Sequence, residues 1–504
     1  MDVETTINSL VQRLGHISIE SKTEILNELK AAIATLPSND LKRIVTSISI
    51  TSIFNCLNTQ DKSQQQICGE ILDKMLTNLT VPAVLENFHS QLLTWLHLPD
   101  ETLKALCLHQ LSRLSKEQPS EFSHYKELVE AIVDEVGADS LNIGPAATSI
   151  LIQIGQDSNG LLLLYSETIL NKFAFVMRKN DVTRFRIYQI VIDLSKAYPA
   201  ALEASVATGL IQQIVNEVQS EDILVQLNAI EMVSDLALSP HGLIFLDQQG
   251  VLSRLEEMMV GLTNNPMMGL LLPGFIKFFG SIAKNEPKEV LSKFDSFVRM
   301  VLSSIDGNDP TLKAVSLDTV GFIALKPEGK LALEKIGNPL TECISSIGSL
   351  LKTGTSDLKV RALHALANLV YLKVEDQTVE LLSLTEKWFK SCTSDSFKTV
   401  WSLAQQPFLD HRLPALRLLQ NLAMLPWGQS LMNNAAGFKE YALDRATENS
   451  KEGKEEKFYL IDILAHSPTT VENFGRPYQL KLIEYYKQGP FFVFAQSEVA
   501  MEGE

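Results

Sequence analysis

Cysteine is scarce in this chain of 504 residues, which carries only Cys56, Cys68, Cys107, Cys343 and Cys392. No two of them stand in a C-x-x-C spacing, so the sequence gives no support to a zinc site or a thioredoxin-like redox site. Their number is odd, and most lie in an apolar context typical of helices. We therefore expect five reduced thiols in the core of a cytosolic or nuclear protein.

Long hydrophobic runs are also absent. The most apolar short run, GLLLLY at 160–165, is far shorter than the roughly 20 residues that a membrane span needs. The N-terminus, MDVETTINSL, has neither the basic nor the apolar region of a signal peptide. These absences predict a cytosolic protein, with the nucleus as a further location.

Basic charge is in deficit, because 44 Lys and Arg face 60 Asp and Glu and leave a net charge of −16. Phosphate binding needs a basic face. We therefore expect neither nucleic acid nor an anionic membrane as the main partner.

Sequence patterns of catalysis are missing as well. The chain contains no H-E-x-x-H, no G-x-S-x-G, no P-loop and no dinucleotide-binding glycine pattern. Adjacent carboxylates such as Glu256 and Glu257 point about 100° apart on a helix and form no acid–base pair. We predict that the chain is not an enzyme and needs no metal or cofactor. An active site without a familiar motif is the alternative.

Apolar residues at helical spacing are abundant instead, and residues 181–199 show the pattern most clearly. Asp181 is predicted to cap a helix there, Ser195 to lie near its end, and Pro199 to stop it. The buried stripe is predicted at Phe185, Ile187, Ile190, Val191 and Leu194.

The same pattern recurs along the chain. The helix ends that align are Leu76, Ser115, Gly155, Ser195, Ala237, Ala283, Ala324, Val370 and Ala423. Most are followed within four residues by a proline, and neighbouring ends lie 39 to 53 residues apart. Armadillo and HEAT repeats run at about 40–47 residues. The sequence thus predicts an all-α, armadillo/HEAT-like helical-repeat solenoid, with an insertion before the last aligned end.

We expect four parts in this solenoid. Residues 1–60 form an N-terminal helical cap and residues 61–430 the repeats. Residues 431–487 form C-terminal helical repeats, in which the charged run NSKEGKEEK at 449–457 is predicted to be a solvated loop. Residues 488–504 form a non-helical tail, whose phenylalanines Phe491, Phe492 and Phe494 are expected to fold back on the last helices.

Polar positions repeat along the predicted last helix of each unit, two and six residues before the aligned end. In armadillo repeats this helix lines the concave groove. The two rows together predict a solvent-facing ladder for partner binding, and merely solvated helix faces are the alternative. The residues assigned to this groove are Gln189, Asp193, Glu231, Asp235, Lys277, Asp318, Phe322, His364, Asn368 and Arg417.

The unit RALHALANL (361–369) lies closest to the armadillo consensus. Only Asn368 and Asn421 match the asparagine row of nuclear-import armadillo proteins, and His364 and Arg417 stand where those proteins carry tryptophan. This argues against recognition of basic import peptides. The mixed charge of the ladder suits a folded, charged partner domain better than an extended peptide, while a cargo adaptor or scaffold is the alternative.

Several longer segments resemble one family over essentially the whole chain, the 26S proteasome non-ATPase regulatory subunit 5 proteins. The most specific segments are NDVTRFRIYQIVIDLS (180–195), LPGFIKFFG (272–280), SLDTVGF (316–322), TEKWF (385–389), PWGQSLM with GFKEYALDR (426–445), and QGPFF with the terminal EGE (488–504). None of these segments is a catalytic signature, and the resemblance depends on their order and spacing.

The resemblance implies a helical-repeat chaperone for assembly of the proteasome regulatory-particle base. Such proteins bind the C-terminal domain of an AAA-type ATPase subunit and prevent premature docking on the 20S core. They are absent from the mature 26S particle and carry no cofactor. Other base subunits of the same precursor module are further candidate partners, and the free chain is expected to be a monomer.

Overall fold

The computed structural model describes residues 3–14, 22–262 and 270–493, and these residues form helices and no strand. They separate into two compact units, Met1–Gln249 and Gly250–Glu504. The boundary falls between α16 and α17. The four-part division expected from the sequence stays a prediction, and its boundary after residue 430 falls inside α28.

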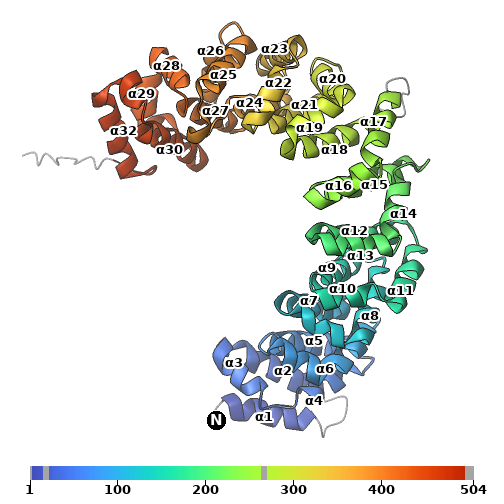
Figure 1. Ribbon diagram of the computed structural model, residues 1–504. Coiled ribbons are helices and arrows are strands. Elements are labelled where there is room, and N and C mark those ends of the chain that lie inside the picture. Colours follow the sequence, from blue (N-terminus) through green and yellow to red (C-terminus); the bar gives the residue numbers. More distant parts are fainter. Residues whose placement is uncertain (1–2, 15–21, 263–269, 494–504) are drawn as a thin grey trace, which may run out of the picture. The chain divides into compact units, whose positions relative to one another are not determined.

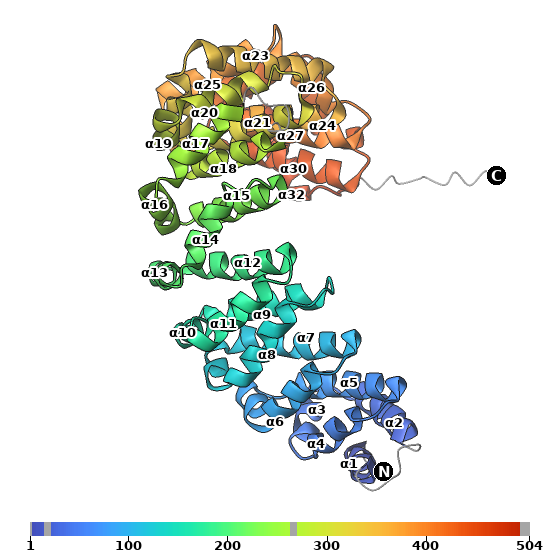
Figure 2. The same cartoon turned by 90° about the vertical axis from the view of Figure 1, so that its right-hand side faces the viewer.

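Within the described residues, the first unit consists of α-helices and two short 3-10 helices. Figures 1 and 2 show its helices. Its elements are α1 (Val3–Leu14), α2 (Lys22–Ala34), α3 (Ser38–Val45), α4 (Ile50–Phe54), η2 (Asn55–Leu57), α5 (Lys62–Leu76), α6 (Val81–Leu96), α7 (Glu101–Glu117), η3 (Pro119–His124), α8 (Lys126–Val136), α9 (Ile143–Gly155), α10 (Ser158–Leu164), α11 (Glu167–Met177), α12 (Asp181–Ala197), α13 (Pro199–Ala207), α14 (Leu210–Glu217), α15 (Ile223–Ala237) and α16 (Pro240–Gln248).

The second unit continues the same kind of repeat. Its elements are α17 (Val251–Gly261), α18 (Leu272–Asn285), α19 (Pro287–Lys293), α20 (Asp295–Ser304), α21 (Pro310–Ile323), α22 (Pro327–Glu334), α23 (Asn338–Thr353), α24 (Ser356–Val370), η6 (Val374–Asp376), α25 (Val379–Cys392), α26 (Ser396–Ala404), α27 (Leu409–Ala423), α28 (Pro426–Asn434), α29 (Phe438–Leu443), η7 (Arg445–Thr447), α30 (Lys451–His466), α31 (Thr470–Phe474) and α32 (Arg476–Gln488).

Most repeats consist of a short first helix, a second helix and a long last helix. The last helices pack side by side, α5, α7, α9, α12 and α15 in the first unit and α18, α21, α24, α27 and α30 in the second. Each last helix buries apolar side chains against its own repeat and the next one. Each repeat therefore needs its neighbours to bury its apolar face. This packing confirms the predicted helical-repeat solenoid.

The aligned helix ends are also confirmed, since all of them lie within two residues of the end of a last helix. Proline has a second role that the sequence reading did not identify. Pro199, Pro240, Pro287, Pro327 and Pro426 are each the first residue of the next short helix. The fixed backbone angle of proline suits that position, where its missing N–H is not needed.

The helix expected at residues 181–199 is α12, and its predicted apolar stripe is buried. Its cap differs from the prediction. Asn180 Oδ1 accepts from the Thr183 N–H at 2.9 Å, and Thr183 Oγ1 accepts from the Asn180 N–H at 3.3 Å, which forms a capping box. Asp181 instead pairs with Arg184, with Arg184 Nη1 3.0 Å from Asp181 Oδ1.

Truncation of one buried side chain in α12 tests this packing. Ile190 is fully buried, so Ile190→Ala is expected to lower the free energy of unfolding by about 2–5 kcal/mol. Val182 lies on the same helix but is 61% exposed, and Val182→Ala should change stability by no more than about 0.5 kcal/mol. Urea unfolding of both variants measures the difference, and equal midpoints would contradict the buried stripe.

A glycine near the start of several short helices lies against the end of the preceding last helix. Gly160, Gly242, Gly329 and Gly428 each occupy the third position of their helix. A Cβ atom at these glycines would lie 1.8 to 2.2 Å from a backbone carbonyl oxygen of the preceding last helix. The close approach therefore requires glycine, and in three of these helices it produces a Pro-x-Gly pattern that the sequence analysis did not single out.

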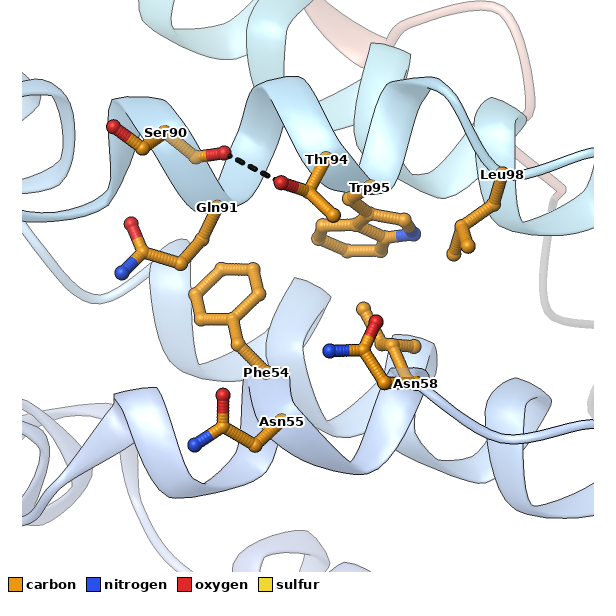
Figure 3. A pocket seen from close by; sticks show the side chains of 9 residues that line it. Phe54, Asn55, Asn58, Ser90, Gln91, Thr94, Trp95 and Leu98 are labelled. Atoms are coloured by element: carbon orange, nitrogen blue, oxygen red, sulfur yellow. Dashed lines mark hydrogen bonds between the residues drawn. The ribbon is translucent and has the colours of Figure 1, made fainter.

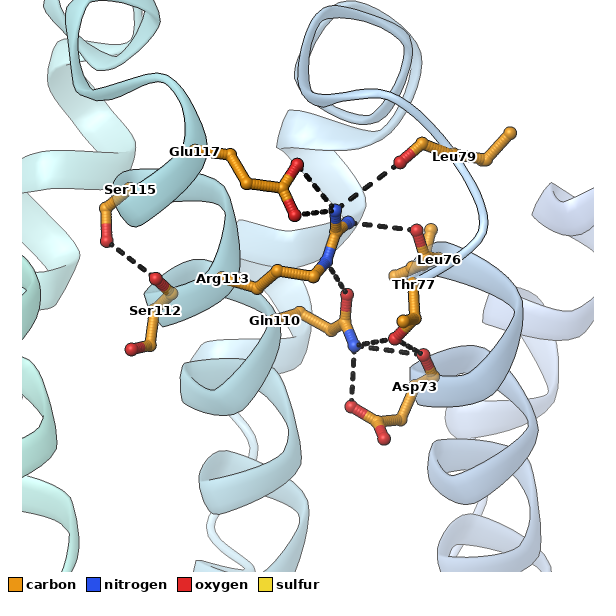
Figure 4. Close-up of polar contacts among 9 residues, drawn as sticks. All are labelled: Asp73, Leu76, Thr77, Leu79, Gln110, Ser112, Arg113, Ser115 and Glu117. Carbon is orange, nitrogen blue, oxygen red and sulfur yellow. Dashed lines mark hydrogen bonds and ion pairs between the residues drawn. The ribbon is translucent and has the colours of Figure 1, made fainter. Parts of the chain in front are cut away.

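Polar side chains of one repeat pair with the helix-end carbonyls of another. In the first unit, Arg113 Nη2 donates to the Leu76 carbonyl at 2.9 Å, and Gln110 Nε2 donates to the Asp73 carbonyl at 2.9 Å (Figure 4). Arg113 also binds Glu117, with Nη1 3.2 Å from Oε1. Each carbonyl also accepts from a backbone N–H at the end of α5, Asp73 from Thr77 at 3.2 Å and Leu76 from Leu79 at 3.0 Å. The side-chain bonds are therefore second contacts to these oxygens, and they join α5 to α7.

Lys330 has the same role deep inside the second unit. Its side chain is fully buried, and Nζ donates to the carbonyls of Ala324 at 2.5 Å, Asn368 at 2.7 Å and Leu369 at 2.8 Å. The acceptors lie at the ends of α21 and α24, where the helix dipole is negative. One lysine thus connects two consecutive repeats.

The prediction of a solvated loop at 449–457 is wrong. Helix α30 begins at Lys451, and Ser450 Oγ caps it by accepting from the Gly453 N–H at 3.0 Å. Lys457 is 1% exposed; its Nζ donates to the Asp444 carbonyl and, at 2.6 Å, to Thr447 Oγ1. The other charged residues of this run lie on the outer side of the helix, and its buried face includes Gly453 and Lys457. The helical spacing of the buried residues was missed because the run contains mostly charged residues.

The start of the tail is held by Arg445. Its Nη1 donates to the Gly489 carbonyl at 2.7 Å, and its guanidinium carbon lies 5.2 Å from the centre of the Phe492 ring. Phe492 remains 37% exposed and Phe491 52% exposed. The start of the tail thus contacts the last repeat through Arg445, while more than half of the Phe491 side chain stays exposed. That the three rings fold back together on the last helices stays a prediction. Phe494 and the residues after it lie outside the described ranges.

The five cysteines are all buried and free, which confirms that they are core residues. Burial raises the pKa of the Cys107 thiol and, to about 12, that of Cys343 and Cys392. Among the described residues, no single helix has both the length and the hydropathy of a membrane span; α10 and α11 pass that test only as a pair bent by 59°.

Candidate functional site

Two hollows lie along the layer of last helices, one inside each unit. The α21–α27 hollow of the second unit has a volume of about 500 Å3 and is lined by α21, α24 and α27. The α9–α15 hollow of the first unit has a volume of about 570 Å3 and is lined by α9, α12 and α15. Together they contain most of the groove residues predicted from the sequence.

All of the predicted groove residues are exposed or half-exposed on a last helix, as the ladder requires. Gln189 and Glu231 line the α9–α15 hollow. The residues that line the α21–α27 hollow are Asp318, Phe322, His364, Asn368 and Arg417. Asp193, Asp235 and Lys277 line neither hollow. Their common role in partner binding stays a prediction.

Asp318 lines the α21–α27 hollow and pairs with a residue that the sequence analysis missed. Arg361, on α24, pairs with Asp318 and with Asp357, where Nε lies 3.1 Å from Oδ2. Burial raises the pKa of Asp318, while the charge of Arg361 acts in the opposite direction. The pair fixes Asp318 across two repeats, so its carboxylate is only partly available to a ligand.

Arg417 on α27 is held in the same way. Its Nε donates to Glu456 Oε1 at 2.8 Å, and Gln420 Nε2 donates to Glu456 Oε2 at 2.8 Å. Glu456 belongs to the run that had been predicted as a loop. Partial burial and the positive charge of Arg417 lower the pKa of His364, which favours the neutral imidazole.

The two asparagines of the row differ in what they contact. Asn421 Nδ2 donates to the Ala367 carbonyl at 3.0 Å, so this amide joins α27 to α24. The Asn368 side chain has no hydrogen-bond partner within the described ranges and lines the hollow. Phe322, 41% exposed, adds an apolar surface beside it, and Lys284 Nζ lies 5.4 Å from its ring centre.

The α9–α15 hollow is more apolar. Its walls include Pro145, Ile152, Val182, Phe185 and Met232. Asp181 and Glu231 also line it, and the exposed Glu231 carboxylate has no salt-bridge partner among the residues described here. This combination suits an apolar side chain of a partner that carries a neighbouring basic group.

Asp193 and Asp235 share a cation that the sequence analysis did not include. Lys196 Nζ lies 2.9 Å from Asp193 Oδ1 and 3.8 Å from Asp235 Oδ2, while Gln189 Nε2 donates to Asp193 Oδ2 at 2.8 Å. Lys196 follows Asp193 by three residues, which was the available sequence signal. Lys196 therefore partly neutralises the negative charge of these two aspartates.

The amino-acid sequence matches a known protein family and several named proteins. Residues 3–504 match the family model described as "Proteasome non-ATPase 26S subunit". The chain is 34% identical to the human protein named 26S proteasome non-ATPase regulatory subunit 5, over 96% of this chain and 97% of that protein. The Drosophila melanogaster protein of the same name is 24% identical, over 96% of each chain.

Solved structures with a similar fold are helical-repeat solenoids. Yeast importin-beta (Kap95p) superposes with a TM-score of 0.57 and 11% identity, over 92% of this chain and 63% of that one. A Kap121p mutant gives a TM-score of 0.51 and 12% identity, over 96% of this chain and 51% of that one. At such identities the likeness concerns the fold alone.

Proposed function

This chain belongs to the proteasome non-ATPase 26S subunit family, and from that premise we propose that it is an assembly chaperone of the regulatory-particle base. In this proposal it binds the C-terminal domain of an AAA-type ATPase subunit and prevents premature docking on the 20S core. It leaves before the 26S particle is mature. It acts in the cytosol and the nucleus as a monomer when free, without catalysis or a cofactor.

One observation carries the proposal, the match to regulatory subunit 5 proteins over 96% of the chain. The two hollows support a binding role, because each is lined by polar and charged side chains together with apolar ones. Interfaces of this composition suit a folded partner, with apolar contacts at the centre and charged groups at the rim.

The direct experiment mixes the purified full-length chain with the isolated C-terminal domain of each base ATPase and measures binding by calorimetry. The proposal expects one of these domains to bind in a one-to-one complex. A second arm asks whether that complex keeps an ATPase pair from binding the 20S core. Binding to none of the domains would contradict the proposal.

Two substitutions locate the contact if a domain binds. Glu231→Lys reverses an exposed charge at the α9–α15 hollow, and Phe322→Ala removes the exposed ring at the α21–α27 hollow. Each is expected to weaken binding at least tenfold, about 1.4 kcal/mol, with unchanged thermal stability. Glu203→Lys makes the same charge change on an exposed residue of α13 and should leave affinity unchanged. Normal affinity in both test variants would place the interface elsewhere.

A cargo adaptor or scaffold of the armadillo type is the second candidate. The unpaired Asn368 carboxamide beside Phe322 favours it, whereas Asn421 already donates to Ala367. Binding of basic peptides on an array, abolished by Asn368→Ala, would support this candidate over the chaperone.

A further inference from the structure

A third cavity lies near the start of the first unit, on helices that carry none of the predicted groove residues. It has a volume of about 200 Å3 and lies between the segment formed by α4 and η2 on one side and α6 on the other (Figure 3). Phe54, Leu57, Trp95 and Leu98 contribute its apolar surface. No charged side chain lines it, so it favours an uncharged ligand.

The indole of Trp95 carries an unused hydrogen-bond donor. Trp95 is fully buried, and its Nε1 has no acceptor within the described part of the chain. A buried tryptophan N–H usually finds a partner, and leaving such a group unpaired is destabilising. The Phe54 ring packs edge-on against the indole at 6.0 Å and holds it in place. The N–H lies on the Leu98 side of the ring (Figure 3).

Three carboxamides surround the cavity. Asn55 and Asn58 come from one wall and Gln91 from the other (Figure 3), and none of these side chains has a hydrogen-bond partner among the described residues. On the same helix, outside the cavity, Asn87 Nδ2 donates to the Ala83 carbonyl at 2.8 Å. On α6, therefore, the amide outside the cavity is paired, whereas Gln91, which lines the cavity, is not.

These groups complement a peptide main chain. Each carboxamide offers a donor and an acceptor, which match the carbonyl and the N–H of a peptide unit. Amides on both walls can bind successive units of an extended segment that runs between them. The small volume suits one side chain of that segment rather than a folded domain.

We propose that this cavity binds an extended, uncharged segment of a partner protein. The carboxamides of Asn55, Asn58 and Gln91 hold the main chain of the segment, and one of its aliphatic side chains packs against Phe54. A carbonyl of the segment accepts from Trp95 Nε1 once the half-exposed Leu98 side chain turns aside. This contact is separate from the two hollows and does not depend on the chaperone proposal.

The test selects a phage-displayed library of random dodecapeptides on the full-length protein and measures the selected peptides by fluorescence anisotropy. We expect peptides with an uncharged core whose affinity is insensitive to salt. The double variant Asn58→Ala/Gln91→Ala should lose at least tenfold in affinity. Trp95→Phe, which keeps a ring but removes the N–H, should lose several-fold.

Asn87→Ala is the matched control, because it removes an exposed carboxamide from the same helix outside the cavity, and it should bind as the unaltered protein does. Circular dichroism and the thermal midpoint establish that every variant is folded. Selection of no peptide, selection of charged peptides that high salt releases, or equal affinity in the double variant and the control would each overturn the proposal.

Discussion

Gly329→Ala is expected to destabilise the second unit by about 3 kcal/mol, at the upper end of the usual cost of overpacking. A Cβ atom at Gly329 would lie 1.8 Å from the Ile323 carbonyl oxygen and 2.9 Å from its carbon. Both atoms belong to the backbone of α21, which cannot rotate away as a side chain would. Helix α22 must therefore move off α21, and the Lys330 contacts next to it would be strained.

Gly261→Ala is the matched control for that substitution. Gly261 is the last residue of α17, and a Cβ atom there would meet nothing within 4 Å. Alanine in this helix should be neutral or stabilising by up to about 1 kcal/mol. Urea unfolding measures the stability of both variants, and hydrogen exchange of α22 measures the local effect. Equal stability of the two variants would contradict the close helix contact.

The free energy of unfolding is expected to increase with pH because of Lys330. Burial lowers the pKa of Lys330 to about 7 from its ordinary 10.5, although the three carbonyl acceptors favour the charged form. Between those two pH values the unfolded chain binds more protons than the folded one. The free energy of unfolding therefore increases with pH in this window, by at most about 1.4 kcal/mol per pH unit.

The comparison with Lys330→Met isolates this effect. The stability difference between the unaltered protein and Lys330→Met should shift in favour of the lysine as pH rises from 7 towards 10. Lys326→Met replaces an exposed lysine of the same segment and should show no such shift. Urea midpoints of the three proteins across this range provide the measurement, and a constant difference would mean that Lys330 keeps an ordinary pKa.

Much of the candidate site could be predicted because groove positions follow helical periodicity. Counting back from aligned ends such as Ala324 and Val370 identified Phe322 and Asn368, and both line the α21–α27 hollow. The same count identified Gln189 at the α9–α15 hollow. It could not separate free groups from paired ones, because Asn421 and Asn368 occupy equivalent positions and only Asn421 reaches a carbonyl of another repeat.

The fold class, the register of the repeats and the exposed face of each last helix follow from the sequence alone. These features depend on local spacing, since an apolar stripe defines a buried face wherever the helix packs. Which polar groups have a structural role depends instead on how the repeats pack. Arg113 pairs with the end of α5, Lys330 with α21 and α24, and the charged run of α30 buries Lys457. These side chains reach atoms outside the helix that carries them, some of them in a neighbouring repeat, so the geometry of packing, rather than the spacing of residues, selects them.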